Sequence, residues 1–292
     1  MSTAANNTEA IATHWVLTLV CKDMPGIVHA ISGAIVAANG NITESQQFAS
    51  EDTGRFFMRL QIESAVPREH FERQLAPVAA RYDMDWHLDV VGRKLRTLIL
   101  VSKSAHCLND MMFRQRSGQL PIEVPAVFGN HDDLAPMAEF YGIPFETHAI
   151  KSDADKAAFE HMLRDYIQTA GIELIVLARY MQILSPEFCA EFAGKIINIH
   201  HSFLPGFKGA NPYGQAHARG VKQIGATAHF VTEDLDEGPI IEQNVLRVTH
   251  NASKQELVSA GQDVESKTLT QAVRWFAEHR VLMDGHRTII FS

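Results

Sequence analysis

The sequence KIINIHHSFLPGFKGANPYGQAHARG, residues 195–220, begins as an apolar strand and ends as an irregular loop. Its isoleucines predict a strand inside a sheet, and the Pro, Gly and Asn residues that follow end that strand. Asn198 and His200 lie two residues apart, so an extended backbone places both side chains on one face, about 6.6–7 Å apart along the strand. An amide and an imidazole at the end of a core strand favour a site that holds a small polar group, such as a carbonyl becoming an oxyanion.

Residues 95–292 continue the pattern of this strand. Apolar strands alternate there with amphipathic helices, which predicts a mostly parallel sheet covered by helices on both faces. Two more strands are expected at 224–231 and 238–248, followed by a long amphipathic helix as the last element. Ser253 and Glu256 form a capping-box pattern at the start of this helix.

Residues 14–91 predict a separate and smaller unit. Strand and helix patterns follow one another in the order βαββαβ, with a hairpin signal at 51–54, which favours a two-layer sandwich with both helices on one face. The charged break at 92–96 has no apolar periodicity. We therefore expect an α/β chain of two domains, 14–91 and 95–292.

The amino-acid composition indicates which kinds of partner and which cell compartment to expect for this protein. The chain has 292 residues, 46% of them hydrophobic, and 26 basic against 34 acidic side chains give a formal net charge of −8. Without a basic block, nucleic acid and anionic membranes are not expected as partners. Three scattered cysteines without a CxxC spacing, a polar start without a signal-peptide pattern and no long apolar run predict a cytoplasmic protein.

A second candidate region is the stretch HFVTEDLDEGPII, residues 229–241, in which a strand runs into an acidic turn. Such a run of carboxylates is ordinarily a solvated turn. Its position after a strand, together with the loop that follows Asn198 and His200, favours a role for a carboxylate such as Asp236 in orienting an imidazole or a water molecule.

Three stretches in this order resemble the motifs of the folate-dependent formyltransferases and formyl hydrolases. They are LARYMQILS at 177–185, NIHHSFLPGFKG at 198–209 and GATAHFVTEDLDEGPII at 225–241. The resemblance covers roughly residues 95–292 and implies a Rossmann-like formyltransferase domain. The stretch CKDMPGIVHAISGAI at 21–35 resembles an ACT domain, which is ferredoxin-like. This pairing and the double histidine imply the hydrolytic branch, which converts 10-formyltetrahydrofolate into tetrahydrofolate and formate for purine and one-carbon metabolism.

The resemblance also implies roles for individual residues. Asn198, His200 and Asp236 correspond to the family's catalytic trio. The amide and the imidazole would hold the developing oxyanion, and the carboxylate would accept or relay a proton. The pterin ring is expected between two segments, with Met181, Gln182 and Ile183 on one side and Glu233, Asp234 and Leu235 on the other.

In the N-terminal unit the resemblance implies regulation and assembly. ACT domains often bind amino acids between paired copies, so Asp23, Gly26 and Ile27 at the predicted helix start are candidate effector contacts. The alternative is that Pro25 and Gly26 only form a turn. A homodimer or homotetramer formed through this unit is expected.

The first alternative function is formyl transfer to an amine. Glycinamide ribonucleotide formyltransferases of this family carry a glycine-rich phosphate loop after the first strand, whereas the present chain has no glycine between Val101 and Arg116. This difference favours water as the second substrate. The second alternative is a non-catalytic amino-acid or folate sensor, which the presence of the whole trio argues against.

Other chemistry is expected to be absent. His201, His217 and His229 lack a zinc-site spacing such as HExxH, so no metal and no cofactor is predicted, the folate being the substrate. Cys107 beside His106 is not expected to act as a nucleophile. Gly214 stands where the hydrolytic branch usually has His, a difference for which His217 can compensate.

Overall fold

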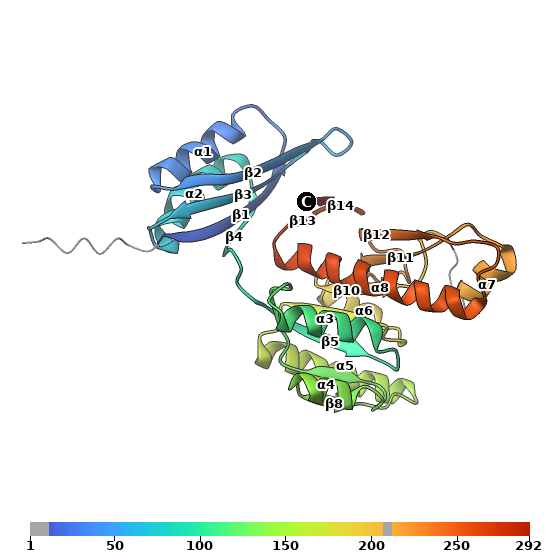
Figure 1. Ribbon diagram of the computed structural model, residues 1–292. Coiled ribbons are helices and arrows are strands. Elements are labelled where there is room, and N and C mark those ends of the chain that lie inside the picture. Colours follow the sequence, from blue (N-terminus) through green and yellow to red (C-terminus); the bar gives the residue numbers. More distant parts are fainter. Residues whose placement is uncertain (1–11, 207–211) are drawn as a thin grey trace, which may run out of the picture. The chain divides into compact units, whose positions relative to one another are not determined.

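The computed structural model describes residues 12–206 and 212–292, which form two compact units (Figure 1). The first unit runs to Arg93 and also contains His279–Asp284 and Ile289–Ser292, and the second comprises Lys94–Glu278 and Gly285–Thr288. The chain therefore divides inside the charged break at 92–96, but its C-terminal residues return to the first unit.

The first unit has the predicted βαββαβ order. Its four strands form an antiparallel sheet in the order β2-β3-β1-β4, and both helices cover one face of it (Figure 1). Alternate β3 residues, among them Met58 and Leu60, point into the core between sheet and helices. The elements are β1 (Thr13–Lys22), α1 (Ile27–Ala37), β2 (Asn41–Ser50), β3 (Arg55–Ser64), α2 (Arg68–Tyr82) and β4 (Asp85–Val90).

The chain ends in a hairpin, β13 (Val281–Asp284) and β14 (Arg287–Ile290), so the expectation that a helix comes last was wrong. Leu282 and Phe291 pack on Phe57, which β3 presents on the sheet face opposite the helices. The hairpin residues of the first unit thus cover apolar surface that the sheet would otherwise expose.

A polar cluster joins this C-terminal segment to β4. The Asp89 carboxylate accepts hydrogen bonds from Arg93 Nε at 2.9 and 2.8 Å and from His279 Nε2 at 2.9 Å. The backbone N–H of Val90 donates to the same carboxylate at 2.8 Å. Burial alone would raise the pKa of Asp89, but the His279 and Arg93 hydrogen bonds lower it well below its usual range.

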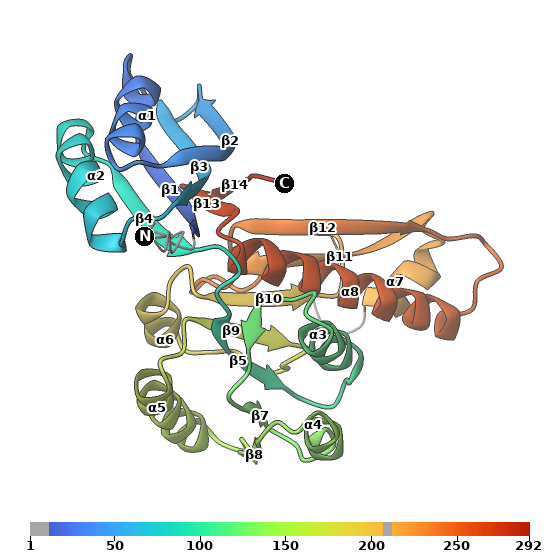
Figure 2. The same cartoon turned by 60° about the vertical axis from the view of Figure 1, so that its left-hand side comes forward.

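The second unit is a sheet in the order β12-β11-β10-β9-β5-β7-β8, with β6 paired to β5. The strands from β10 to β8 are parallel, and β11 and β12 are antiparallel additions next to β10. Figure 2 shows α5 and α6 on one side of these strands and α3 and α4 on the other. The predicted α/β class with a mostly parallel sheet is confirmed.

The elements of this unit agree closely with the apolar pattern. The strands are β5 (Leu95–Val101), β6 (Ile122–Glu123), β7 (Val127–Gly129), β8 (Phe145–Thr147), β9 (Leu174–Ala178), β10 (Ile196–His200), β11 (Gln223–Phe230) and β12 (Ile240–Arg247). The helices are α3 (His106–Arg116), α4 (Ala135–Tyr141), α5 (Asp153–Ala170), α6 (Pro186–Glu191), α7 (Pro212–Arg219) and α8 (Lys254–Ala277). Among the described helices, none combines the length and apolar character needed to cross a bilayer.

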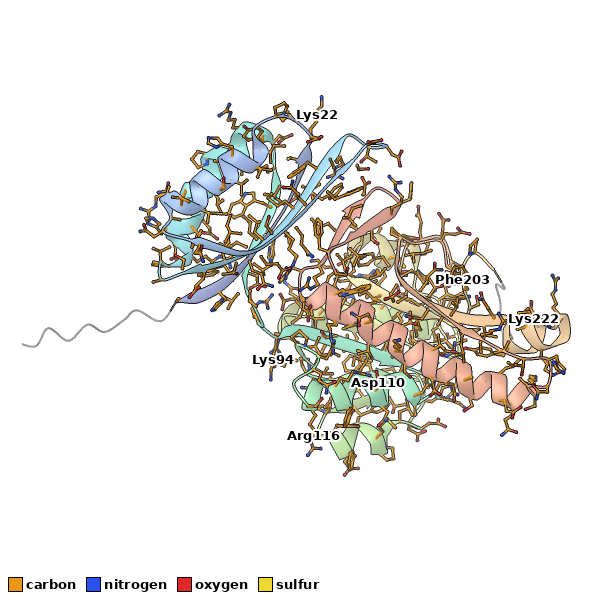
Figure 3. The ribbon with its side chains drawn as sticks, turned by 45° about the horizontal axis from the view of Figure 1, so that its top comes forward. Lys22, Lys94, Asp110, Arg116, Phe203 and Lys222 are labelled. Atoms are coloured by element: carbon orange, nitrogen blue, oxygen red, sulfur yellow. The ribbon has the colours of Figure 1, made fainter. Side chains whose placement is uncertain are left out.

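Helix α8 packs against β10, β11 and β12. The predicted capping box is present, because Ser253 Oγ accepts from Glu256 N–H while the Glu256 carboxylate accepts from Ser253 N–H. Thr270 of α8 donates a hydrogen bond of 2.6 Å to Asp110 of α3, which Figure 3 labels. This hydrogen bond therefore ties α3 to α8.

Candidate active site

A pocket of about 380 Å³ lies at the carboxyl end of β10, where ligands bind in open α/β sheets. It brings together the ends of three neighbouring strands, β9, β10 and β11, and the loops that follow them. Its lining residues are Leu177, Arg179, Tyr180, Met181, Gln182, Ile183, Leu184, Cys189, Asn198, Ile199, His200, His201, His229, Val231, Thr232, Glu233, Asp234, Leu235 and Asp236. The predicted catalytic trio and all six predicted pterin contacts are among them.

Asn198 is oriented by a histidine on the neighbouring strand. The two residues are partners in the antiparallel register of β10 and β11, and Asn198 Nδ2 lies 3.3 Å from His229 Nε2. His229 Nδ1 is 2.8 Å from the Phe230 carbonyl, which can only accept, so the ring proton lies on Nδ1 and Nε2 accepts from the amide. Burial lowers the pKa of His229, which keeps this ring neutral.

His200 is held by the acidic turn. Its Nδ1 lies 3.2 Å from Asp236 Oδ1, and its Nε2 is buried without a hydrogen-bond partner among the described residues. The hydrogen bond from His200 lowers the pKa of Asp236 despite the opposing effect of burial, so this carboxylate is ionised at neutral pH. Because Nδ1 donates to the carboxylate, His200 Nε2 carries a lone pair and can accept a proton.

The acidic turn owes its shape to a close backbone approach. A Cβ atom at Gly238 would lie 1.7 Å from the Phe230 carbonyl oxygen, so only glycine fits there. The Pro239 carbonyl accepts from Phe230 N–H at 2.9 Å, which fixes the turn against the end of β11. Asp236 itself has a φ of 59°, a left-handed conformation that is uncommon outside glycine and that aims its carboxylate at His200.

The loop after β9 forms the wall of the pocket that faces the acidic turn, and hydrogen bonds hold both ends of this loop in place. Met181 N–H donates to Ser102 Oγ at 2.9 Å, and Ser185 N–H donates to the buried Glu160 carboxylate at 2.7 Å. Between these anchors the Met181 and Ile183 side chains are 55% and 62% exposed. On the facing turn Leu235 is 61% exposed, so apolar side chains rim both sides of the pocket and suit a flat ring.

Sequence reasoning did not predict a role in the site for three polar lining residues, Arg179, His229 and His201. It gave no role to Arg179, and it treated His229 as a packed strand histidine and His201 only as a rejected zinc ligand. His229 is indeed buried in β11, but it also orients Asn198. Asn198 and His229 are far apart in the sequence and meet only through the register of β10 and β11. The sequence therefore did not reveal that the two side chains are in contact.

Other residues considered from the sequence lie elsewhere. Gly214 and His217 belong to α7 and are not among the lining residues of this pocket. Cys107 is buried, and burial raises the pKa of its thiol well above the usual value, which opposes a thiolate. Among the described residues, the groups that could share a metal ion are His87, Asp89 and His279, and His106, Cys107 and Glu265; neither contains a member of the trio.

The predicted effector contacts lie at the start of α1. Gly26 has a φ of 96°, and a Cβ there would lie 2.9 Å from Tyr82 Oη, so glycine is needed for both conformation and space. Asp23 N–H donates to the Gly54 carbonyl at 2.9 Å, and the Ile27 side chain is buried in the core. A ligand could therefore meet backbone groups of Gly26 and Ile27 and the exposed Asp23 side chain.

Known proteins share both units. A family model described as formyl transferase matches residues 95–273, and an ACT domain model matches residues 15–75. The formyltetrahydrofolate deformylase of Corynebacterium sp. (strain P-1) is 49% identical over 278 residues, which are 94% of this chain and 97% of the relative. This chain belongs to the formyltetrahydrofolate deformylase family. The family resemblance inferred from the three motifs is thereby confirmed.

Solved structures separate the deformylases from their transferase relatives. The crystal structure of a formyltetrahydrofolate deformylase from Burkholderia mallei has a TM-score of 0.92 and 46% identity, covering 96% of this chain and 100% of that chain. A glycinamide ribonucleotide transformylase from Symbiobacterium toebii has a TM-score of 0.63 and 31% identity, covering 70% of this chain and 98% of that chain. The likeness to deformylases thus extends over nearly the whole chain, including the N-terminal unit.

Proposed function

We propose that the protein hydrolyses 10-formyltetrahydrofolate to tetrahydrofolate and formate. The observation that carries this proposal is the buried Nε2 of His200, which has no partner among the described residues, beside Asn198 in a pocket with apolar rims. A formyl group on N10 is an amide, and its hydrolysis needs a proton acceptor for water, a donor for the oxyanion and a proton for the leaving nitrogen. The names of the relatives that match nearly the whole chain support the same activity.

The pterin would enter between the loop after β9 and the acidic turn. Its alternating donors and acceptors suit the backbone groups of Met181 to Ile183 and of Glu233 to Leu235, and its faces suit the exposed Met181, Ile183 and Leu235 side chains. This arrangement leaves the formyl group at the end of β10. Because backbone groups would make most of these contacts, substitution of a single side chain would lower the affinity for the folate by less than the whole contribution of the loop.

In the proposed reaction His200 Nε2 takes a proton from water as the water oxygen bonds to the formyl carbon. The Asn198 amide donates to the resulting oxyanion, and ionised Asp236 stabilises the positive charge on the His200 ring. The oxyanion then collapses, the C–N10 bond breaks and the proton on His200 passes to N10, which releases tetrahydrofolate and formic acid; the acid loses its proton to solvent as formate. Atoms balance with one water consumed per turnover.

We also propose that the reaction proceeds without a metal ion or redox cofactor. Both nitrogens of His229 and Nδ1 of His200 already have hydrogen-bond partners, so these rings offer few atoms to a metal. Retention of the rate after treatment with a chelator supports this, and loss restored by added zinc contradicts it.

The wider roles of the chain are proposals of the same kind. An amino acid would bind through its carboxylate to the backbone at Gly26 and Ile27, at the positive end of α1, with Asp23 beside it. Pairing of the N-terminal units would give a homodimer or homotetramer, and the three buried, free cysteines suit a reducing cytoplasm. Assays with and without glycine and methionine, and light scattering, test effector and assembly.

The experiment that tests the activity is incubation of the purified protein with 10-formyltetrahydrofolate. The proposal expects formate and tetrahydrofolate in equal amounts. Formylated product from an added amine, in place of formate, indicates a transferase. No turnover of the folate indicates a sensor that has kept only the pocket.

A further inference from the structure

A buried carboxylate lies outside the pocket at the end of β10 but contacts one of the residues that line it. Glu265 of α8 is 1% exposed and is not a lining residue. It accepts hydrogen bonds from Tyr213 Oη at 2.5 Å and from His106 Nε2 at 2.8 Å, and Arg179 Nε lies 3.3 Å from it. Because Arg179 does line the pocket, Glu265 is connected to the site through this arginine.

Glu265 is ionised and fixed in position. Burial alone would raise the pKa of its carboxyl group, but the His106 hydrogen bond, the charge of Arg179 and the Tyr213 hydrogen bond lower it. Gly261, one turn earlier on α8, leaves space for the Tyr213 ring, since a Cβ there would lie 2.2 Å from that ring. Removal of this carboxylate would leave the arginine as a partly buried charge without its counterion, which is costly.

Arg179 links this carboxylate to the histidines of the site. Its Nη1 donates to Nδ1 of His201, and because a guanidinium can only donate, this ring nitrogen accepts. Arg179 has a φ of 61°, an uncommon left-handed conformation that needs support from the surrounding structure. The ion pair with Glu265 supplies such support for the side chain that starts from this backbone position.

His201 in turn supports the ring of His200. The two rings are stacked, with centroids 5.1 Å apart and planes 15° apart. The contact of Nδ1 with Asp236 holds His200 at one edge, but a ring held at one atom can still tilt about that contact. The lone pair on Nε2 lies in the plane of the ring. A stacked neighbour that fixes the plane therefore also fixes the direction in which His200 accepts a proton.

We infer that Glu265 is a positioning residue for the hydrolysis: its charge holds Arg179 against His201, the ring on which the proton acceptor lies. This inference rests on the proposed function, in which His200 is that acceptor. The charge of Glu265 has a second effect. Without it, the guanidinium is an unbalanced positive charge near a ring that must itself become positive during the reaction.

The test compares acetate with acetamide in the full-length Glu265→Ala variant, assayed with 10-formyltetrahydrofolate at initial rates. Acetate has the same carbons and oxygens as the part of the side chain that is removed, and acetamide has that shape without the charge. Tyr213, His106 and Arg179 each line a pocket, from which a small solute can reach the vacated space. The substitution is expected to lower kcat about 100-fold with KM for the folate kept. Acetate is expected to restore kcat severalfold, and acetamide to leave it unchanged.

Glu191→Ala is the matched control. The Glu191 carboxylate also pairs with an arginine, Arg164 at 2.6 Å, and neither residue lines the pocket. This variant is expected to keep the wild-type rate with and without acetate. Glu265→Gln keeps the shape of the side chain without its charge, so it is expected to lose kcat and, because no space is left, not to respond to acetate. Tyr213→Phe keeps the charge and the ring and removes one hydrogen bond, so a smaller loss is expected.

The outcomes separate the inference from the function on which it rests, with each rate taken per folded molecule. Wild-type kcat in Glu265→Gln, a loss confined to KM, or a loss in Glu265→Ala that acetate does not reverse overturns the inference. Equal restoration by acetate and acetamide also overturns it, because packing alone would then explain the effect. Should Glu265→Ala not fold, kcat of Glu265→Gln decides: a loss supports the inference and an unchanged value overturns it. Absence of formate from wild type overturns the proposed hydrolysis instead.

Discussion

The histidine–aspartate pair of the first unit, His279 and Asp89, can be compared with the pair of the second unit, His200 and Asp236, and the better hydrogen-bonded pair is not the candidate site. In the first unit Asp89 bonds to His279 at 2.9 Å and to Arg93 with both oxygens. In the second unit Asp236 lies 3.2 Å from His200, whose other nitrogen has no partner among the described residues. The Asp89 carboxylate has several hydrogen-bond donors and links β4 to the C-terminal segment, which is a structural role. In the second pair the Nε2 atom of His200 is still available to accept a proton from a substrate, and for this reason we assign the chemistry to that pair.

The largest effect is expected from His200→Asn. Asparagine can keep a hydrogen bond to Asp236 from near the position of Nδ1, but it removes the Nε2 lone pair that accepts the proton. Formate kcat should fall by about 10²–10⁴. The purified variant, assayed for formate release, should retain its melting temperature; a rate close to wild type contradicts the role of His200.

Asn198→Ala is expected to lower kcat by about 10²–10³, because it removes an oxyanion donor and leaves the pterin contacts intact. Folate binding, measured by calorimetry with tetrahydrofolate, should be largely kept. Turnover near that of wild type would remove Asn198 from the mechanism.

Gly238→Ala tests whether the shape of the acidic turn matters for catalysis. The added Cβ would collide with the Phe230 carbonyl, so the turn and the Asp236 carboxylate must shift, at an expected cost of about 100-fold in kcat. Gly33→Ala is the matched control. Nothing lies within 4 Å of a Cβ at Gly33 in α1, so that change should stabilise the helix by about 0.5–1 kcal/mol and leave the rate unchanged.

His279→Asn makes the same change, histidine to asparagine, in the pair formed by His279 and Asp89. Asparagine tolerates the left-handed φ of 54° at this position, so the main loss is the hydrogen bond to ionised Asp89. The free energy of unfolding of the first unit should fall by about 1.5–3 kcal/mol, measured by urea titration. Activity per folded molecule should not change; a loss like that of His200→Asn would abolish the contrast between the pairs.

The smallest effects concern pH. The folded-state pKa of His229 is lowered by burial, so the unfolded chain binds the proton first and stability declines as pH falls below about 6.5. The lowered pKa values of Asp89 and Asp236 add stability that is present above about pH 3.9 and is lost as pH falls through their folded values. Urea titrations at pH 7.5, 5.5, 3.5 and 2.5 should show the first decline between pH 7.5 and 5.5 and the second at the two lowest pH values, and a rise in stability on acidification contradicts these signs.

The sequence alone was enough to predict the parts of the molecule that depend on local sequence patterns. The strand and helix order, the capping box of α8 and the strand-end positions of Asn198 and His200 all follow from short-range periodicity and spacing. The C-terminal hairpin carried a turn signal at Asp284 and Gly285, but its strands have four residues each and a mixed pattern, so it was overlooked.

The contacts of Arg179, Tyr213 and His106 with the buried Glu265 carboxylate could not be predicted from the sequence, for a different reason. These residues come from the loop after β9, from α7, from the start of α3 and from the middle of α8, and no sequence spacing connects them. Their contacts become visible only when the fold brings the side chains together.

The central claim is that water, activated by His200, is the acceptor of the formyl group. The most direct measurement is turnover of 10-formyltetrahydrofolate in water enriched in oxygen-18, with the formate analysed by mass spectrometry. The account predicts one labelled oxygen in each formate and one tetrahydrofolate released with it. Formate without solvent oxygen, or loss of the formyl group without formate, would contradict it.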